Sequence, residues 1–219
     1  MSNLNFLKRS AILFLIGTFS ICPTINAQDG WRNAEELFMA MQLGDGSWAA
    51  DIGCREGYYT IRMAPIVGSG RIFAVDINAR ALSDLHDNLK ARGIENVTPV
   101  YSVDENPMLP YEVLDAALVR NTYHEFTKPL SMLKYIRRAL KPKGRLVIAE
   151  AISEGLKDDA REKQARSHQI AKRFVKADLN KAGFRIIKEV DPFTETRRGR
   201  HFWMLIAILN DNSAKSDQD

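Results

Sequence analysis

The sequence predicts an α/β fold, with a doubly wound sheet of seven strands whose last strand is antiparallel. The first observation is that short apolar stretches alternate with helical stretches through five units, a pattern typical of a parallel sheet covered by helices. The second is that two final apolar stretches, 184–190 and 202–209, follow each other with no helical pattern between them. Such a pair favours an antiparallel hairpin at one edge of the sheet.

The expected elements follow in order along the chain. An amphipathic helix at 31–43 precedes the first strand at 48–52, and a nearly continuous apolar run at 71–76 is typical of a strand buried in a parallel sheet. The other expected elements are helices at 58–67, 79–91 and 129–140, strands at 97–103, 113–119 and 145–150, a turn at 142–144 and a basic helical stretch at 161–181. We therefore expect one domain at 28–209 and a disordered polar tail at 210–219.

The first 27 residues resemble a signal peptide. Lys8 and Arg9 precede a largely apolar run at 11–21, which is far shorter than the roughly 20 residues that a membrane-spanning helix needs. Ala27 offers a small residue for cleavage. We expect export, with the mature chain in the periplasm of a bacterium, and we keep an uncleaved membrane anchor as the alternative.

Composition and charge limit the classes of partner. The chain has 219 residues, a formal net charge of +4 and 45% hydrophobic residues, enough for one globular domain. Two of the positive charges, Lys8 and Arg9, leave with the signal peptide, and no nucleic-acid recognition motif is visible. Cys22 leaves with it too, so Cys54 has no partner for an intramolecular disulfide. We expect no nucleic-acid partner and no stable transmembrane span, and the sequence gives no oligomeric state.

The most informative segment runs from the first strand into the next helix, as Asp51-Ile52-Gly53-Cys54-Arg55-Glu56-Gly57. It resembles the cofactor loop of class I S-adenosylmethionine (SAM)-dependent methyltransferases, which is usually Asp-x-Gly-x-Gly-x-Gly. The resemblance covers nearly all of the mature chain and implies a Rossmann-like sheet, SAM as cofactor, and cofactor contacts from Asp51, Gly53, Arg55 and Gly57. Arg55 replaces the middle glycine. Its guanidinium could meet the cofactor's carboxylate or occupy the cofactor's place.

Three further residues are cofactor candidates, because ligands of such sheets bind beyond the carboxyl ends of the strands. Asp76 ends the second strand, where a carboxylate can accept hydrogen bonds from ribose hydroxyls; the alternative is a helix cap. Asp104 follows the third strand, where the resemblance implies a contact with adenine; the alternative is a residue that simply starts the loop. Asn121 follows the fourth strand, and the resemblance places it nearest the sulfonium.

The segment after the fourth strand, Arg120-Asn121-Thr122-Tyr123-His124-Glu125-Phe126, resembles the substrate-side motif of small-molecule methyltransferases. The resemblance implies that Tyr123 and His124 face the substrate as catalytic residues, since histidine can take a proton from a hydroxyl or amine near neutral pH. His168, on the basic helical stretch, is a secondary candidate, whereas His86 and His201 are interpreted as structural. No element carries metal-ligand spacing, so we expect no metal.

These observations favour a SAM-dependent methyltransferase that acts on a small molecule. The alternative is an exported, non-catalytic SAM- or nucleotide-binding protein with a degenerate methyltransferase fold. An NAD-dependent oxidoreductase would use an acid like Asp76, but its loop would read Gly-x-Gly-x-x-Gly and its sheet would lack the terminal hairpin.

Overall fold

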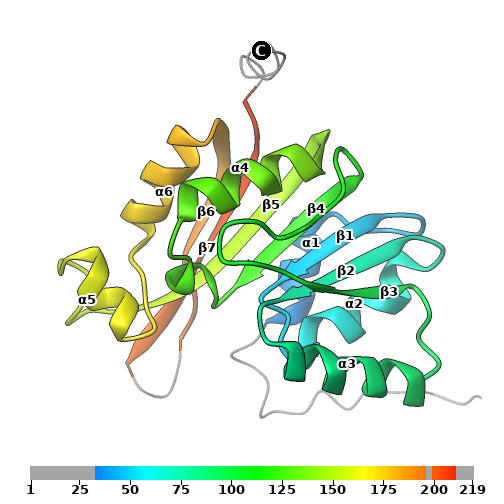
Figure 1. Ribbon diagram of the computed structural model, residues 1–219. Coiled ribbons are helices and arrows are strands. Elements are labelled where there is room, and N and C mark those ends of the chain that lie inside the picture. The colour runs from blue at the N-terminus through cyan, green and yellow to red at the C-terminus, as the bar shows by residue number, and fades with distance from the viewer. Residues whose placement is uncertain (1–32, 196–198, 211–219) are drawn as a thin grey trace, which may run out of the picture. The chain divides into compact units, whose positions relative to one another are not determined.

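The computed structural model describes residues 33–195 and 199–210, and these form a seven-stranded mixed sheet (Figure 1). The strand order across the sheet is β3-β2-β1-β4-β5-β7-β6. The strands are β1 (Trp48–Ile52), β2 (Arg71–Asp76), β3 (Val97–Tyr101), β4 (Leu114–Arg120), β5 (Leu140–Ser153), β6 (Phe184–Glu195) and β7 (Arg200–Leu209). Strands β1 to β5 pair in parallel, while β7 is antiparallel to both β5 and β6. The predicted doubly wound sheet with an antiparallel last strand is therefore confirmed.

Helices cover both faces of the sheet, as the two apolar cores show. The helices are α1 (Ala34–Met41), α2 (Tyr58–Val67), α3 (Ala79–Ala91), α4 (Pro129–Ala139), α5 (Arg161–Arg166) and α6 (Lys172–Lys181). Helices α1, α2 and α3 supply buried side chains such as Leu37, Met63 and Leu85 to one core. Helices α4 and α6 supply Leu133 and Leu179 to the other. The strands after β1 are added on one side of it as far as β3, and β4 is added on the other side, so the strand order reverses between β1 and β4 and places a topological switch point at their carboxyl ends.

The structure corrects two of the expected elements. The basic stretch at 161–181 is two helices, α5 and α6, because the chain between them leaves the helical path and His168 has a left-handed φ of 53°. The expected turn at 142–144 lies inside β5, which begins at Leu140 and passes a register shift opposite β4 between Leu114 and Ala116. Periodicity predicted the residues of α5 and α6 as helical, but it did not indicate the break at 167–171.

The terminal hairpin is longer than its apolar runs predicted. Strand β6 extends to Glu195 and β7 begins at Arg200, with register shifts between Ile186 and Lys188 and between Val190 and Thr194. Asn210 still donates its N–H to the carbonyl of Gly183, 3.0 Å away, so this residue of the expected tail is held. The expected signal peptide and the tail beyond Asn210 lie outside the described residues. Among the helices that are described, none combines the length and the apolar character that crossing a membrane requires.

Candidate functional site

The residues predicted to carry function gather at the carboxyl ends of the parallel strands. Strands β2, β1 and β4 are neighbours in the sheet, and Asp76, Asp51 and Arg120 lie at or near their ends. The loop after each strand therefore emerges at the same edge. This is where open α/β sheets bind their ligands.

The loop after β1 depends on two glycines with left-handed backbone conformations. Gly53 has φ +81°, and a Cβ there would lie 2.2 Å from Oγ1 of Thr122, in the loop after β4. Gly57 has φ +84°, and its Cβ would lie 2.3 Å from Cδ1 of Leu85 on α3. Both positions exclude a side chain, by conformation and by space. The sequence prediction that these glycines shape a tight loop is in keeping with this geometry.

Arg55 lies between these two glycines in the loop. Its backbone is also in the left-handed region, with φ +48°. Its backbone N–H donates to Oδ2 of Asp76 over 2.8 Å, which ties the loop to the end of β2. Its side chain is exposed. The pKa of Glu125 is lowered, chiefly by neighbouring His124, and the charges of Arg55 and His168 act in the same direction. Arg55 therefore faces the edge of the sheet that also carries Glu125.

Asp76 organises the loops rather than capping a helix. Its second oxygen, Oδ1, accepts the N–H of Asn78 over 2.8 Å. The cap of α3 is Asn78 itself, whose side chain accepts the N–H groups of Arg80 and Ala81. The alternative interpretation of Asp76 as the helix cap is therefore wrong, and its carboxylate retains lone pairs for further donors.

Asp51 lies beneath the loop. It is 2% exposed, and its Oδ2 accepts the hydroxyl of Thr60 over 2.6 Å. Burial raises the pKa of Asp51 to about 6, although the hydrogen bond from Thr60 opposes the shift. In this structure Asp51 supports the glycine loop from inside, and we find it beside Thr60 rather than on an open surface.

A cavity of about 630 Å³ opens beside the ends of β2 and β3. Its lining includes Ile77, Tyr101, Asp104 and Tyr135. Asp104 lies in a turn closed by reciprocal backbone hydrogen bonds between Val103 and Asn106. The sequence-predicted Asp104 thus borders a cavity with both aromatic and carboxylate groups, a lining suited to a flat heterocycle.

The two residues expected on the substrate side of β4 lie in different surroundings. Tyr123 is fully buried, and its hydroxyl donates to Oδ2 of Asp178 over 2.9 Å, beside Arg161. Burial also raises the pKa of its phenol, so Tyr123 stays protonated. The ring of Tyr123 packs into the core, and its expected role toward the substrate stays a prediction. Asn121, in contrast, is exposed, has φ +54°, and donates its N–H to the carbonyl of Ala149.

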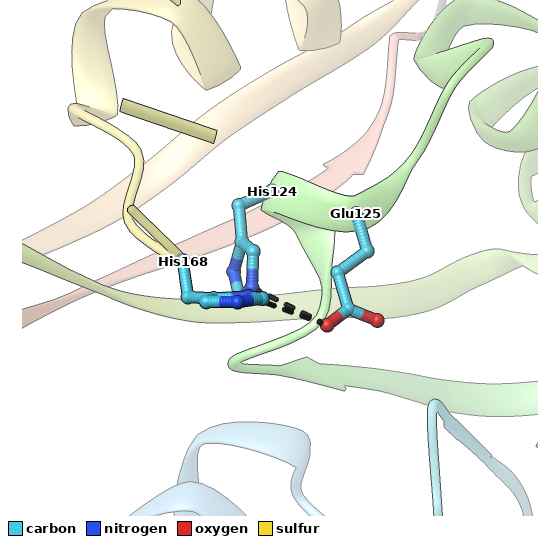
Figure 2. Close-up of side chains that lie close together, drawn as sticks. All are labelled: His124, Glu125 and His168. Carbon is cyan, nitrogen blue, oxygen red and sulfur yellow. Dashed lines mark ion pairs between the residues drawn. The ribbon is translucent and has the colours of Figure 1, made fainter. Parts of the chain in front are cut away.

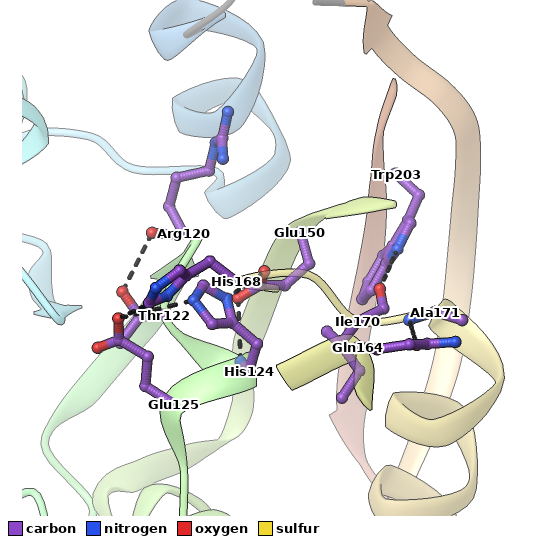
Figure 3. Close-up of polar contacts among 10 residues, drawn as sticks. All are labelled: Arg120, Thr122, His124, Glu125, Glu150, Gln164, His168, Ile170, Ala171 and Trp203. Atoms are coloured by element: carbon purple, nitrogen blue, oxygen red, sulfur yellow. Dashed lines mark hydrogen bonds and ion pairs between the residues drawn. The ribbon is translucent and has the colours of Figure 1, made fainter. Parts of the chain in front are cut away.

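His124 is held by two carboxylates. Its Nδ1 lies 2.9 Å from Oε2 of Glu150, and its Nε2 lies 3.6 Å from Oε1 of Glu125 (Figures 2 and 3). Burial would lower the pKa of His124, but the two neighbouring carboxylates outweigh it and raise this pKa to about 9. His124 is then an imidazolium at neutral pH. In this state both ring nitrogens carry protons, so the expected role of His124 as a proton acceptor stays a prediction and would first require loss of the Nε2 proton.

His168 joins this group from the loop between α5 and α6. Its Nδ1 lies 3.8 Å from Oε1 of Glu125, and its ring stands edge-on to that of His124, with 5.5 Å between centroids. Within the described residues, one ligand atom from each of His124, Glu125 and His168 lies within 4.8 Å of the others. The spacing of residues within single elements could not indicate this cluster, because its members come from two loops.

The other two histidines of the described residues lie outside this cluster, and two acids that contact His124 had no predicted role. His86 is exposed on α3, and His201 lies 3.0 Å from Oδ1 of Asp191, so neither is part of the cluster. Sequence reasoning did not assign a role to Glu125 or Glu150. Glu150 is fully buried. Its place as a charged residue at the end of the apolar run Leu-Val-Ile-Ala-Glu could have indicated a functional role.

We predict that the ring of His124 titrates near pH 9 in metal-free protein, measured by NMR in the presence of a chelator. Because its folded pKa is raised, its contribution to the free energy of unfolding is complete below about pH 6.5 and is lost as the pH rises through about 9, on the order of 3 kcal/mol in all. Glu150→Gln removes a raising charge and should lower the midpoint, whereas His86→Gln should leave it unchanged. A midpoint near 6.5 in the unmodified protein would contradict this electrostatic account.

Comparison with known proteins agrees with this geometry. A family model described as a methyltransferase domain matches residues 44–194. Demethylmenaquinone methyltransferase of Lactobacillus johnsonii is 31% identical over 131 residues, which cover 58% of this chain and 52% of that protein. A probable cobalt-precorrin-6B C(15)-methyltransferase of Methanothermobacter thermautotrophicus is 30% identical over 112 residues, 51% of this chain and 56% of that protein. The chain spans about half the length of these curated relatives.

Solved structures share the fold at lower identity. A SAM-dependent methyltransferase from Aquifex aeolicus has a TM-score of 0.68 at 21% identity, covering 81% of this chain and 89% of that one. The [4+2]-cyclase SpnF has a TM-score of 0.73 at 18% identity, covering 84% and 82%. The match of the family model over more than half of the chain, together with the sheet order and the loop after β1, shows that this protein belongs to the class I SAM-dependent methyltransferase family, whose cofactor is S-adenosyl-L-methionine.

Proposed function

We propose that this protein transfers a methyl group from SAM to a small molecule. The observation that carries the proposal is the arrangement of the sheet edge. The Gly53–Gly57 loop, the Asp76 carboxylate and the cavity bordered by Asp104 lie at the ends of β1, β2 and β3, and the polar cluster around His124 follows β4. Cofactor-side and substrate-side groups therefore meet at one edge.

The residues at this edge suit the parts of SAM in turn. The glycine loop lets backbone N–H groups approach a ligand, and Asp76 offers carboxylate oxygens to ribose hydroxyls. The cavity beside Asp104 has room for an adenine ring. Exposed Arg55 is placed to pair with the carboxylate of the methionine part. When bound, SAM supplies the electrophilic methyl group.

The protein's own task is to position the acceptor and to manage its charge. An enzyme gains much of its rate by holding the nucleophile in line with the reacting carbon and by excluding water. His124 is buried and held by Glu150, whereas Glu125 and Asn121 are exposed in the same segment after β4. His124 thus supplies a fixed donor, and the exposed groups are available to a hydroxyl or amine of the acceptor.

Names of relatives support a small-molecule acceptor. Demethylmenaquinone and a cobalt-precorrin are the small-molecule acceptors in the names of the two relatives above. The alternative function, a non-catalytic binding protein, is favoured by Arg55 in place of the middle glycine. An NAD-dependent oxidoreductase is not favoured, because the family model and the hairpin both support the methyltransferase fold.

We predict that the protein binds SAM with micromolar affinity in calorimetry, and that Asp76→Asn weakens binding about 10- to 100-fold. The substitution removes the negative charge of the carboxylate that would accept hydrogen bonds from two ribose hydroxyls. The expected loss of binding free energy is about 1.4 to 3 kcal/mol. Asp87→Asn is the matched control, since Asp87 is an exposed acid on α3. If SAM and S-adenosylhomocysteine both fail to bind at millimolar concentration, the proposed function is excluded and the non-catalytic alternative gains support.

We predict that Arg55→Gly weakens SAM binding about tenfold while raising the free energy of unfolding by about 1 kcal/mol. Binding weakens because a charge-assisted contact to the cofactor's carboxylate is lost. Stability rises because glycine adopts φ +48° without the steric cost that arginine bears. Calorimetry and urea unfolding measure the two effects separately, with Arg92→Ala as the control. Tighter SAM binding by Arg55→Gly would show instead that the side chain occupies the cofactor's place.

We also propose that the mature protein is exported to the periplasm. The support is the sequence of residues 1–27, with Lys8 and Arg9 before an apolar run and Ala27 at its end. Fractionation of bacterial cells that express the chain with a C-terminal tag should place a shortened protein in the periplasmic fraction. A full-length protein in the membrane fraction would favour the uncleaved anchor instead.

A further inference from the structure

We propose that His124, Glu125 and His168 bind one divalent transition-metal ion, with Zn²⁺ as the best match to their chemistry. The three side chains converge from the turn after β4 and from the loop between α5 and α6 (Figure 2). They supply two imidazole nitrogens and one carboxylate oxygen. This donor set occurs at catalytic zinc sites and in the two-histidine, one-carboxylate sites of iron enzymes.

The distances within the cluster suit an intervening ion better than direct hydrogen bonds. Oε1 of Glu125 lies 3.6 Å from Nε2 of His124 and 3.8 Å from Nδ1 of His168, and all three ligand atoms lie within 4.8 Å of one another. A hydrogen bond would require about 2.7 to 3.2 Å. Ligand atoms bound to zinc at about 2.1 Å in tetrahedral geometry stand about 3.4 Å apart. Small movements of the side chains are therefore enough to bind an ion.

The side chains that must move are exposed, and the one that anchors the site is fixed. Glu125 is 51% exposed and His168 is 73% exposed, whereas His124 is 2% exposed. Two of the three ligands can thus adjust to the ion without disturbing the core. The buried third ligand sets where the ion would lie.

Glu150 gives the cluster the orienting partner that metal-binding histidines usually have. Nδ1 of His124 lies 2.9 Å from Oε2 of this fully buried carboxylate (Figure 3). When a metal ion displaces the Nε2 proton to solvent and the Nδ1–H donates to Glu150, the lone pair of Nε2 points toward Glu125 and His168. A carboxylate behind a ligating histidine fixes its tautomer and raises its basicity as a ligand.

The loop that carries His168 is held in place by buried amide side chains. Oε1 of Gln164 accepts the N–H of Ala171 over 2.7 Å, and Oε1 of Gln169 accepts the N–H of Ser153 over 2.7 Å. The N–H of Ile170 also donates to the carbonyl of Ala151 in β5. These contacts fix the backbone of the loop that carries His168, so only the exposed side chains of His168 and Glu125 need to adjust to an ion.

Three protein ligands leave coordination positions open, which is the arrangement of a catalytic rather than a structural site. This part of the inference rests on the proposed function: at the substrate side of the edge, the ion would bind an oxygen of the methyl acceptor. A hydroxyl bound to zinc would pass its proton more readily to solvent water. Its oxygen would then form the bond to the methyl carbon while the S–CH3 bond of SAM breaks and S-adenosylhomocysteine leaves. The substrate class would then be a small molecule with a hydroxyl or carboxylate oxygen.

The test titrates the purified full chain with Zn²⁺ after removal of metal by a chelator, and repeats it with Co²⁺. We expect one ion per chain by calorimetry and visible absorption bands from Co²⁺ with nitrogen and oxygen ligands. His168→Ala and Glu125→Gln should each weaken Zn²⁺ binding about 100-fold, and Glu150→Gln about 10- to 100-fold. His86→Ala, which removes an exposed histidine from α3, should change nothing.

Two outcomes would overturn the inference: no binding of either ion at millimolar concentration, or binding that His168→Ala leaves intact. His168 and Glu125 are exposed, so these variants should fold, and circular dichroism with urea unfolding checks this. SAM binding is measured in the same samples. If the protein binds SAM but no metal ion, only the metal site is overturned. If it binds a metal ion but no SAM, only the proposed function is overturned.

Discussion

The site depends on a single buried contact, the hydrogen bond between His124 and Glu150. A carboxylate that is fully buried in β5 is costly unless it is paired, and the ring of His124 provides the partner. The pairing binds the turn after β4 to the neighbouring strand and turns Nε2 outward. Because the turn is fixed in this way, Glu125 projects toward His168 and Arg55. One buried ion pair therefore determines the direction of the exposed groups.

The sheet was predictable because its signals are local and repeated. Apolar strands, glycine-bounded helices and the final pair of strands each leave a pattern within a few residues, and together they allow few topologies. The glycine loop was predictable for the same reason, although the sequence could not show that Gly53 approaches Thr122 so closely. The break between α5 and α6 was missed, since the side chains of Gln164 and Gln169 stabilise it by accepting the N–H groups of Ala171 and Ser153, contacts that helical periodicity does not reveal.

The site residues were predicted less well, because their surroundings are tertiary. Tyr123 and His124 are adjacent in the sequence, yet the phenol enters the core to meet Asp178 while the imidazole meets Glu150. A 3₁₀ turn at Tyr123–Glu125 sends the neighbouring side chains in different directions. The raised pKa of His124 follows from two carboxylates that lie one residue and 26 residues away in the chain. No spacing rule on one element contains that information.

Glu125 connects the cofactor half of the edge with the substrate half. Its carboxylate lies beside His124, and its pKa is lowered further by Arg55 in the glycine loop and by His168 in the loop before α6. The negative charge of Glu125 offsets the positive charges around it, which would otherwise repel a cationic cofactor such as SAM. The positive charge of the arginine that replaces the middle glycine is offset by Glu125, the acid in the turn after β4. The departure from the family's loop and the acid after β4 are best understood together, as one electrostatic arrangement.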